Sequence, residues 1–215
     1  MDLLKTFLSQ HNAQHAYEGL MAYAKLLVEH NRKSNLIGPL GLKEVLSELL
    51  LDALLPALAT PPQGPLMDIG SGAGLPGIPL AILCPELPIH LIEPRRKRHT
   101  FQRIATRRLG LKHTHLHESR IEAFDGIAPG QAGTVAAKAY RPPAELIAQA
   151  AHWLRPGGLL YLYASQTSWD AQAQEAAAQH HMTTIGQKAH PTHPERFGLV
   201  LQFKGIDTNS SESTP

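Results

Sequence analysis

Four glycines fall within the eight residues 70–77, in the stretch MDIGSGAGLPG that covers residues 67–77. Glycine accepts positive φ and lets a backbone approach a ligand closely, although it loses more entropy on ordering than any other residue. Packing alone does not require so many glycines in one short loop. Such a loop could cradle a phosphate or hold the nucleoside of a methyl donor.

The spacing of these glycines separates the two possibilities. Gly70, Gly72 and Gly74 form G-x-G-x-G, and Leu75 stands where a dinucleotide-binding fingerprint has its third glycine. The loop is not followed by GK[ST], which excludes a triphosphate-binding P-loop. Asp68 places a carboxylate just before the loop, where it would repel a pyrophosphate but suit a cationic methionine group.

A second acidic residue, Glu93, closes the apolar stretch PIHLIE. A carboxylate at the end of a strand can accept hydrogen bonds from both hydroxyls of a ribose. Either Asp68 or Glu93 taken alone could be a surface helix cap, because short motifs often match by chance. Together, flanking the glycine loop, they favour an S-adenosylmethionine site.

Strands and helices that alternate along the chain must position this loop. Helical spacing of apolar residues predicts helices over residues 2–32 and 43–58. Strands are expected at residues 65–70, 88–93, 112–117, 133–140, 159–165, 182–189 and 197–204, with helices at 75–85, 94–110, 142–154 and 168–180. This alternation predicts an α/β fold with a mostly parallel seven-stranded sheet, whose ligand lies at the carboxyl ends of the strands.

The composition is that of an ordinary globular protein, with 43% apolar and 18% charged residues in a chain of 215. The net charge is only +2, so any affinity for nucleic acid must come from a local patch. The single cysteine, Cys84, excludes an internal disulfide. The chain does not open with a signal-peptide pattern, and its longest apolar stretch is too short and too charged to span a bilayer. We therefore expect a cytoplasmic protein without a membrane partner.

Two further clusters could bind a partner. Residues 95–112 hold eight basic residues and no acidic one, which could track the phosphates of RNA or form a solvated helix face. His113, His115 and His117 alternate on one predicted strand, but no second ligand cluster accompanies them and no metal site is expected. The candidate RNA contacts are Arg95, Arg96, Lys97, Arg98 and Arg103.

Several segments together resemble one family: MDIGSGAGLPGIPLAI, LIEPRRKRHTFQRI, LGLK, HESRIEAF and AAKAYRPPAEL. This is the glucose-inhibited division protein B family, the small-subunit ribosomal RNA methyltransferases G. The resemblance runs from about Asn35 to the last strand and is concentrated in residues 67–141. It implies a Rossmann-like class I methyltransferase that uses S-adenosylmethionine to methylate N7 of a guanine in 16S ribosomal RNA. It also implies donor contacts at Gly70, Leu75, Ile121, Glu122 and Lys138.

Guanine N7 already carries a lone pair, so no proton has to be removed before it attacks the methyl group. Alignment of donor and acceptor is then sufficient, and we expect no general base and no dedicated catalytic residue. The resemblance further implies a monomer whose partner is 16S ribosomal RNA or the small ribosomal subunit. It is consistent with a helical extension at 1–62, a methyltransferase domain at 63–205 and a disordered tail at 206–215.

Three departures from the family pattern leave the substrate open. Glu48 and Leu49 stand where the family has an arginine–histidine pair, Ala164 replaces a lysine, and Lys138 replaces an arginine. Arginine offers a planar fork that lysine lacks. The alternatives are a methyltransferase for another RNA or a small molecule, a non-catalytic RNA-binding paralogue, or a nicotinamide oxidoreductase, which Leu75 disfavours.

Overall fold

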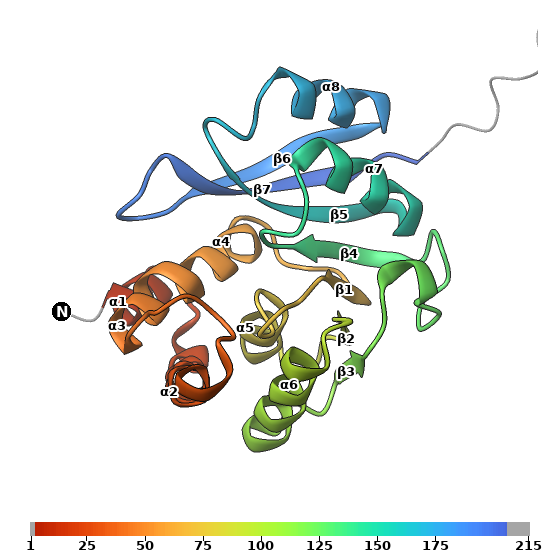
Figure 1. Ribbon diagram of the computed structural model, residues 1–215. Helices are drawn as coiled ribbons and strands as arrows, with labels where there is room; N and C mark the ends of the chain where they lie inside the picture. The colour runs from red at the N-terminus through yellow and green to blue at the C-terminus, as the bar shows by residue number, and fades with distance from the viewer. Residues whose placement is uncertain (1–2, 206–215) are drawn as a thin grey trace, which may run out of the picture.

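The computed structural model describes residues 3–205, and a seven-stranded sheet with helices on both faces lies at its centre (Figure 1). The strand order is β3-β2-β1-β4-β5-β7-β6. The strands are β1 (Leu66–Ile69), β2 (Ile89–Ile92), β3 (Thr114–His117), β4 (Ala132–Ala137), β5 (Leu154–Ser165), β6 (Met182–Ala189) and β7 (Arg196–Phe203). The predicted α/β architecture with seven strands is confirmed.

The register of the strands decides which residues meet at the functional edge. β1 pairs in parallel with β2 and β4, and β4 pairs in parallel with β5, so their carboxyl ends share one edge. β7 runs antiparallel to both β5 and β6. Arg196, the first residue of β7, therefore lies opposite Ser165, the last residue of β5. One edge of the sheet therefore holds the carboxyl ends of β1 to β6 and the beginning of β7.

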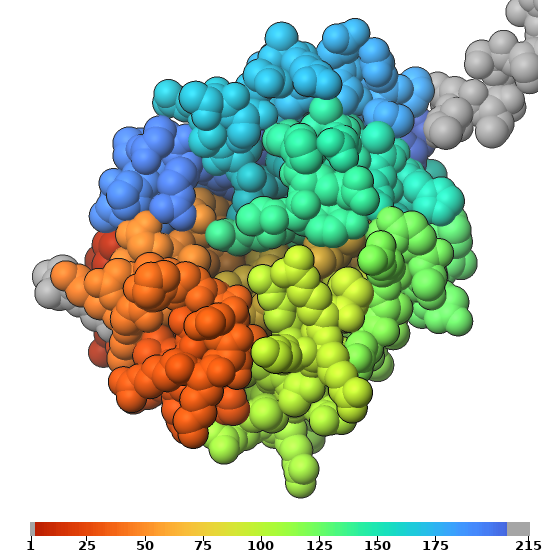
Figure 2. Space-filling model, viewed as in Figure 1, coloured from red at the N-terminus to blue at the C-terminus, as the bar shows by residue number. Residues whose placement is uncertain are grey.

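Each face of the sheet is covered by a different set of helices (Figure 1). One face packs against α1 (Leu3–Gln10), α2 (Tyr17–Ser34), α4 (Leu51–Ala59), α5 (Gly77–Leu83) and α6 (Arg96–Leu109). The other face packs against α7 (Pro143–Trp153) and α8 (Ala171–Gln179). Figure 2 shows the N-terminal helices, in red and orange, packed beside the yellow-green segment that carries α6.

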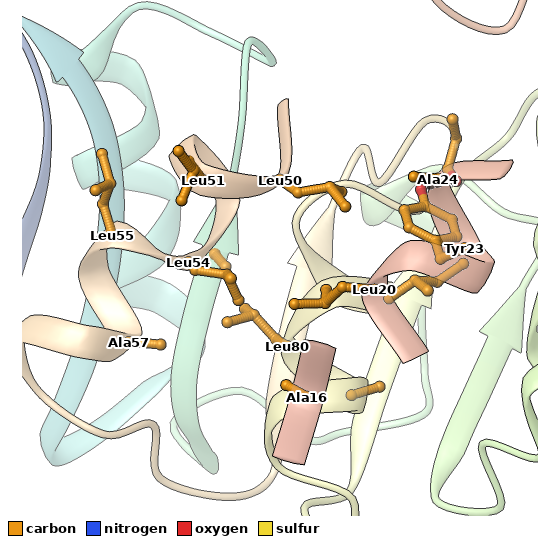
Figure 3. Packing of buried hydrophobic residues seen from close by; sticks show 14 of the residues in the cluster. Ala16, Leu20, Tyr23, Ala24, Leu50, Leu51, Leu54, Leu55, Ala57 and Leu80 are labelled. Atoms are coloured by element: carbon orange, nitrogen blue, oxygen red, sulfur yellow. Dashed lines mark hydrogen bonds between the residues drawn. The ribbon is translucent and has the colours of Figure 1, made fainter. Parts of the chain in front are cut away.

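The N-terminal helices share one hydrophobic core with the sheet. Leu50, Leu54 and Leu80 are fully buried in it, together with Tyr23 and Leu20 (Figure 3). Burial of such side chains stabilises a fold by about 1.5–3 kcal/mol each. The domain boundary at residues 62 and 63 stays a prediction, and the predicted tail at 206–215 lies outside the described residues.

The predicted first helix, 2–32, is wrong in its continuity. The chain leaves α1 after Gln10, turns through Asn12 at a φ of 56°, forms the short helix η1 (Gln14–Ala16) and then begins α2. Residues 9–12 at the break are all polar, and so short a polar stretch does not by itself distinguish a turn from the exposed side of a helix. The second predicted helix, 43–58, agrees with α3 (Leu42–Glu44), η2 (Val45–Leu50) and α4, which follow one another without interruption.

Strand β5 is longer than predicted. The sequence RPGG indicated a turn that ends the preceding helix, yet β5 begins at Leu154 and passes through that segment. A shift in register between Ala132 and Thr134 of β4 accommodates the additional residues, and Gly157 adopts a φ of 79°. Strand β4 ends at Ala137 rather than at residue 140, so Lys138 is the first residue beyond it.

Candidate functional site

The glycine loop leaves the carboxyl end of β1 and leads into α5. Gly70, Gly72 and Gly74 have φ values of 70°, 58° and 95°, which side chains rarely tolerate. A Cβ at Gly70 would overlap the Tyr140 ring, whereas a Cβ at Gly72 would meet nothing closer than 3.7 Å. Gly70 thus permits close packing, and Gly72 leaves one side of the loop open to a ligand.

Asp68 is fully buried beneath this loop. Its Oδ2 accepts a hydrogen bond from the Gly77 amide at 2.7 Å, and its Oδ1 has no hydrogen-bond partner. Burial raises the pKa of Asp68 to about 8; the Gly77 hydrogen bond opposes this shift and the nearby Glu93 carboxylate adds to it. The carboxyl is therefore largely protonated at neutral pH, and a cation beside it would favour ionisation.

Glu93 follows β2 directly and is only 2% exposed. Its Oε2 accepts a hydrogen bond from the Gly72 amide at 2.9 Å, and its Oε1 accepts one from the Arg95 amide at 2.8 Å. Arg98 Nη1 lies 3.9 Å from Oε2. Each carboxylate oxygen can accept a second hydrogen bond, so Glu93 can hold the loop and still receive hydroxyl donors.

Two residues that the sequence analysis missed support the loop from below. Tyr23 of α2 donates its hydroxyl to the Ala73 carbonyl at 2.8 Å. Gln102 of α6 donates from Nε2 to Ser71 Oγ and to the Gly72 carbonyl, both at 2.8 Å. Nothing in the sequence links Tyr23 to a loop fifty residues away. Helices on both sides of the loop thus hold its backbone in place.

A cavity of about 220 Å³ opens beside the loop, at the ends of β1 and β2. Three predicted donor contacts, Gly70, Ile121 and Glu122, line it. Ser119 Oγ, also in the lining, is buried without a hydrogen-bond partner. Leu75 does not line this cavity but packs, half-buried, against the core. Five further residues of the lining were not predicted as contacts from the sequence: Pro94, Ser119, Arg120, Tyr140 and Arg141.

Lys138 lines a second cavity, of about 250 Å³, on the other side of the loop that follows β4. Lys138 and Ala139 border this cavity, whereas Tyr140 and Arg141 border the first one. The Lys138 Nζ lies 3.4 Å from Asp52 Oδ2 of α4. A cationic cavity is therefore adjacent to the glycine-loop cavity at the same edge of the sheet.

The candidate RNA contacts separate into two groups. Arg95, Arg96, Lys97 and Arg103 are exposed. Arg98 is half-buried and turned toward Glu93 and the glycine loop. The four exposed cations are placed where an RNA could reach them, whereas Arg98 belongs to the surroundings of the loop.

The predicted histidine strand is only partly confirmed. His113 precedes β3, while His115 and His117 lie on it and pack against His90 of β2. His90 Nδ1 and His117 Nε2 are 3.1 Å apart. Among residues 3–205, no group of three or more His, Cys, Asp or Glu side chains is arranged to hold a metal ion. Nor is any helix in that range long and apolar enough to cross a membrane.

Comparison with known proteins bears on this site. Residues 16–195 match the GidB family model, described as rRNA small subunit methyltransferase G. The chain belongs to this family. A relative named ribosomal RNA small subunit methyltransferase G from Stenotrophomonas maltophilia is 41% identical over 143 residues, which are 66% of this chain. That match spans 65% of the relative's own length.

A second family member aligns over more of its length. The ribosomal RNA small subunit methyltransferase G of Paracoccus denitrificans is 31% identical over 190 residues, covering 88% of this chain and 95% of the relative. Among solved structures, a predicted O-methyltransferase from Agrobacterium tumefaciens superposes with a TM-score of 0.56 at 20% identity, covering 78% of this chain and 91% of that chain. M. jannaschii TYW2, solved in complex with AdoMet, gives 0.52 at 13%, covering 66% and 68%. These likenesses show the class I methyltransferase fold.

Proposed function

We propose that this protein is an S-adenosylmethionine-dependent methyltransferase that methylates N7 of a guanine in 16S ribosomal RNA. The observation that carries the proposal is the adjacency of two cavities at the carboxyl edge of the sheet. One is bordered by the glycine loop and the other by Lys138. Ligands of open α/β sheets bind at this edge. Membership of the rRNA small subunit methyltransferase G family supports the choice of acceptor.

The residues around the first cavity fit the methyl donor. Ser119 Oγ, in the lining of this cavity, is a buried polar atom without a hydrogen-bond partner, as expected where a polar ligand supplies one. We propose that Glu93 accepts the ribose hydroxyls and that Ile121 and Glu122 border the base. Asp68 does not border this cavity, and we propose that its buried carboxyl favours the positively charged methionine end from beneath the loop.

When bound, S-adenosylmethionine supplies an electrophilic methyl group on a sulfonium centre. The task of the protein is to align guanine N7 with that methyl group and to exclude water. We propose that Lys138 holds the acceptor nucleotide at the boundary between the two cavities. Its ammonium group is a compact charge, whereas the arginine expected from the family pattern has a planar guanidinium. Leu75, Gly72 and Gly74 shape the loop beneath the donor.

The partner in this proposal is 16S ribosomal RNA or the small ribosomal subunit, bound by a cytoplasmic monomer. A direct test combines two measurements. Calorimetry should show micromolar binding of S-adenosylmethionine, about −8 kcal/mol, without competition by NADH. Mass spectrometry should find one N7-methylguanine in small-subunit RNA after incubation with enzyme and donor.

Other outcomes separate the alternatives. Donor binding without transfer would identify a non-catalytic paralogue. Methyl transfer to another nucleotide or to a small molecule would show that the protein is a methyltransferase with a different substrate from the one proposed. Tight NADH binding without donor binding would refute the proposal.

The exposed basic segment at the beginning of α6 provides a further prediction. Replacing Arg95, Arg96 and Arg103 together with alanine should weaken RNA binding and make it less dependent on salt. Each lost phosphate contact lowers the slope of log affinity against log salt by roughly 0.7–0.9. A reduction of about 2 is therefore expected when binding is measured over a salt series, and donor affinity should not change.

A matched control removes three exposed cations from the opposite edge of the sheet. Arg108 lies in the last turn of α6, Lys112 precedes β3 and Lys204 follows β7. The control variant has the same net charge as the test variant. Equal salt slopes for the two variants would assign the α6 cations to a solvated surface rather than to RNA binding.

A further inference from the structure

Arg196 joins the beginning of β7 to the N-terminal helices at the rim of the second cavity. Its Nη1 donates to Glu48 Oε2 at 2.8 Å, and its Nη2 donates to Asp52 Oδ2 and, at 3.3 Å, to the Glu48 carbonyl. Glu48 lies in η2 and Asp52 in α4. Two carboxylates from a segment about 145 residues away in the sequence thus accept from both terminal nitrogens of the guanidinium.

The lining of the second cavity suits a phosphate group. Among the described residues that line it, Arg196 and Lys138 are the two cations, and both contact Asp52, the one carboxylate. Ser165 and Ser168 add hydroxyl groups to the same wall. An arginine fork with neighbouring hydroxyl and ammonium donors is a favourable arrangement for binding a phosphate through two parallel hydrogen bonds.

The two carboxylates on Arg196 differ in how firmly they are held. Asp52 is 8% exposed and forms ion pairs with both cations, Lys138 and Arg196, so it is held firmly between them. The Glu48 side chain is 28% exposed and also contacts His193 Nε2 at 3.3 Å, which gives it a second partner besides Arg196. A partly exposed ion pair is weak enough to be exchanged for a better anion.

We propose that the Arg196 guanidinium anchors a phosphate of the acceptor RNA, and that Glu48 occupies this fork as an internal competitor until the phosphate displaces it. The inference rests on the proposed RNA methyltransferase function. Arg196 then supplies a planar guanidinium beside Lys138, whose compact ammonium group cannot form two parallel hydrogen bonds.

The test measures binding of an in vitro transcript of small-subunit ribosomal RNA by fluorescence anisotropy over a series of salt concentrations. Glu48→Gln removes the competing charge and keeps the side-chain shape. We expect roughly threefold to tenfold tighter binding, with the slope of log affinity against log salt steeper by about 0.7–0.9. In the wild type the displaced Glu48 carboxylate takes up a cation, which offsets the counterion released from the phosphate, and the neutral amide of the Glu48→Gln variant takes up none.

The gain in RNA affinity from Glu48→Gln should disappear when the Arg196 guanidinium is absent. Arg196→Gln should bind RNA more weakly than the wild type, and adding Glu48→Gln to it should produce no further increase. Arg196→Lys, which keeps a charge beside Asp52, serves as the second background if melting curves show that Arg196→Gln does not fold. A gain that persists in these backgrounds would overturn the proposal, because it would reflect general charge repulsion.

Glu195→Gln is the matched control. It removes one carboxylate next to Arg196 in the sequence, but that carboxylate pairs with His193 Nδ1 at 3.5 Å. Its salt slope should equal that of the wild type, and a slope as steep as that of Glu48→Gln would also overturn the proposal. The proposal likewise fails if inorganic phosphate raises the melting temperature of Glu48→Gln while its RNA affinity is unchanged, because the site would then hold a free anion.

Failure of the proposed function is distinguishable from failure of this inference. A wild-type enzyme that neither binds nor methylates ribosomal RNA would overturn both. Normal RNA binding and methylation, together with no gain from Glu48→Gln, would overturn the inference alone.

Discussion

Replacing Gly77 with alanine should lower the melting temperature by roughly 4–24 °C and abolish measurable donor binding. A Cβ at this position would overlap Leu91 Cδ2 and would lie 2.7 Å from Asp68 Oδ2. Overpacking of this kind costs about 1–3 kcal/mol, and disturbing the Gly77–Asp68 hydrogen bond adds about 1–3 kcal/mol. In a chain of this size each kcal/mol lowers the melting temperature by about 2–4 °C. Circular dichroism and calorimetry would measure the two effects.

Gly38 provides the control for this variant. It is exposed, it does not have a positive φ, and no atom lies within 4 Å of where its Cβ would be. Gly38→Ala should leave both the melting temperature and the donor affinity unchanged. If Gly77→Ala behaved in the same way, the loop would not depend on close packing between α5 and β2.

Replacing Glu93 with alanine should reduce donor affinity tenfold to a hundredfold. The proposed ribose contacts are charge-assisted hydrogen bonds, and losing them costs about 1.4–2.8 kcal/mol by that ratio. Glu93 also accepts the Gly72 and Arg95 amides, so the variant leaves two backbone donors without an acceptor. We therefore expect a lower melting temperature even without ligand.

Calorimetry well below the melting temperature separates the loss of affinity from the loss of stability. Glu86→Ala is the control, because Glu86 is exposed in the connection between α5 and β2, far from the loop. It should change neither quantity appreciably. Full donor affinity in Glu93→Ala would reduce the role of Glu93 to holding the loop backbone.

Local signals in the sequence were sufficient for much of the fold. Alternating helical and extended patterns predicted the seven strands, and Gly110 marked the end of α6, where it adopts a φ of 66°. The glycine loop and its flanking acidic residues were also predicted from local signals, namely the spacing of the glycines and the ends of two apolar stretches. Backbone conformation and capping depend on neighbours within a few residues, which the sequence displays directly.

Where the sequence prediction was wrong, contacts distant in the chain prevailed over local preference. The break after α1 and the passage of β5 through RPGG satisfy packing and strand pairing that no local pattern records. The depth of Asp68 was not evident from the sequence either: it lies buried beneath the loop, bonded to Gly77. That position depends on how tightly α5 packs on β1 and β2.

The amino-acid sequence by itself determined the order of the elements, the conformation of the glycine loop and the placement of Asp68 and Glu93 at strand ends. Only the tertiary structure decided which side chains meet there. Arg196 reaches Glu48 and Asp52 because antiparallel β7 begins at the edge where β5 ends, with α4 packed against the sheet. Ion pairs and cavities form between segments far apart in the chain, and their geometry is set by strand order and packing rather than by spacing along the sequence.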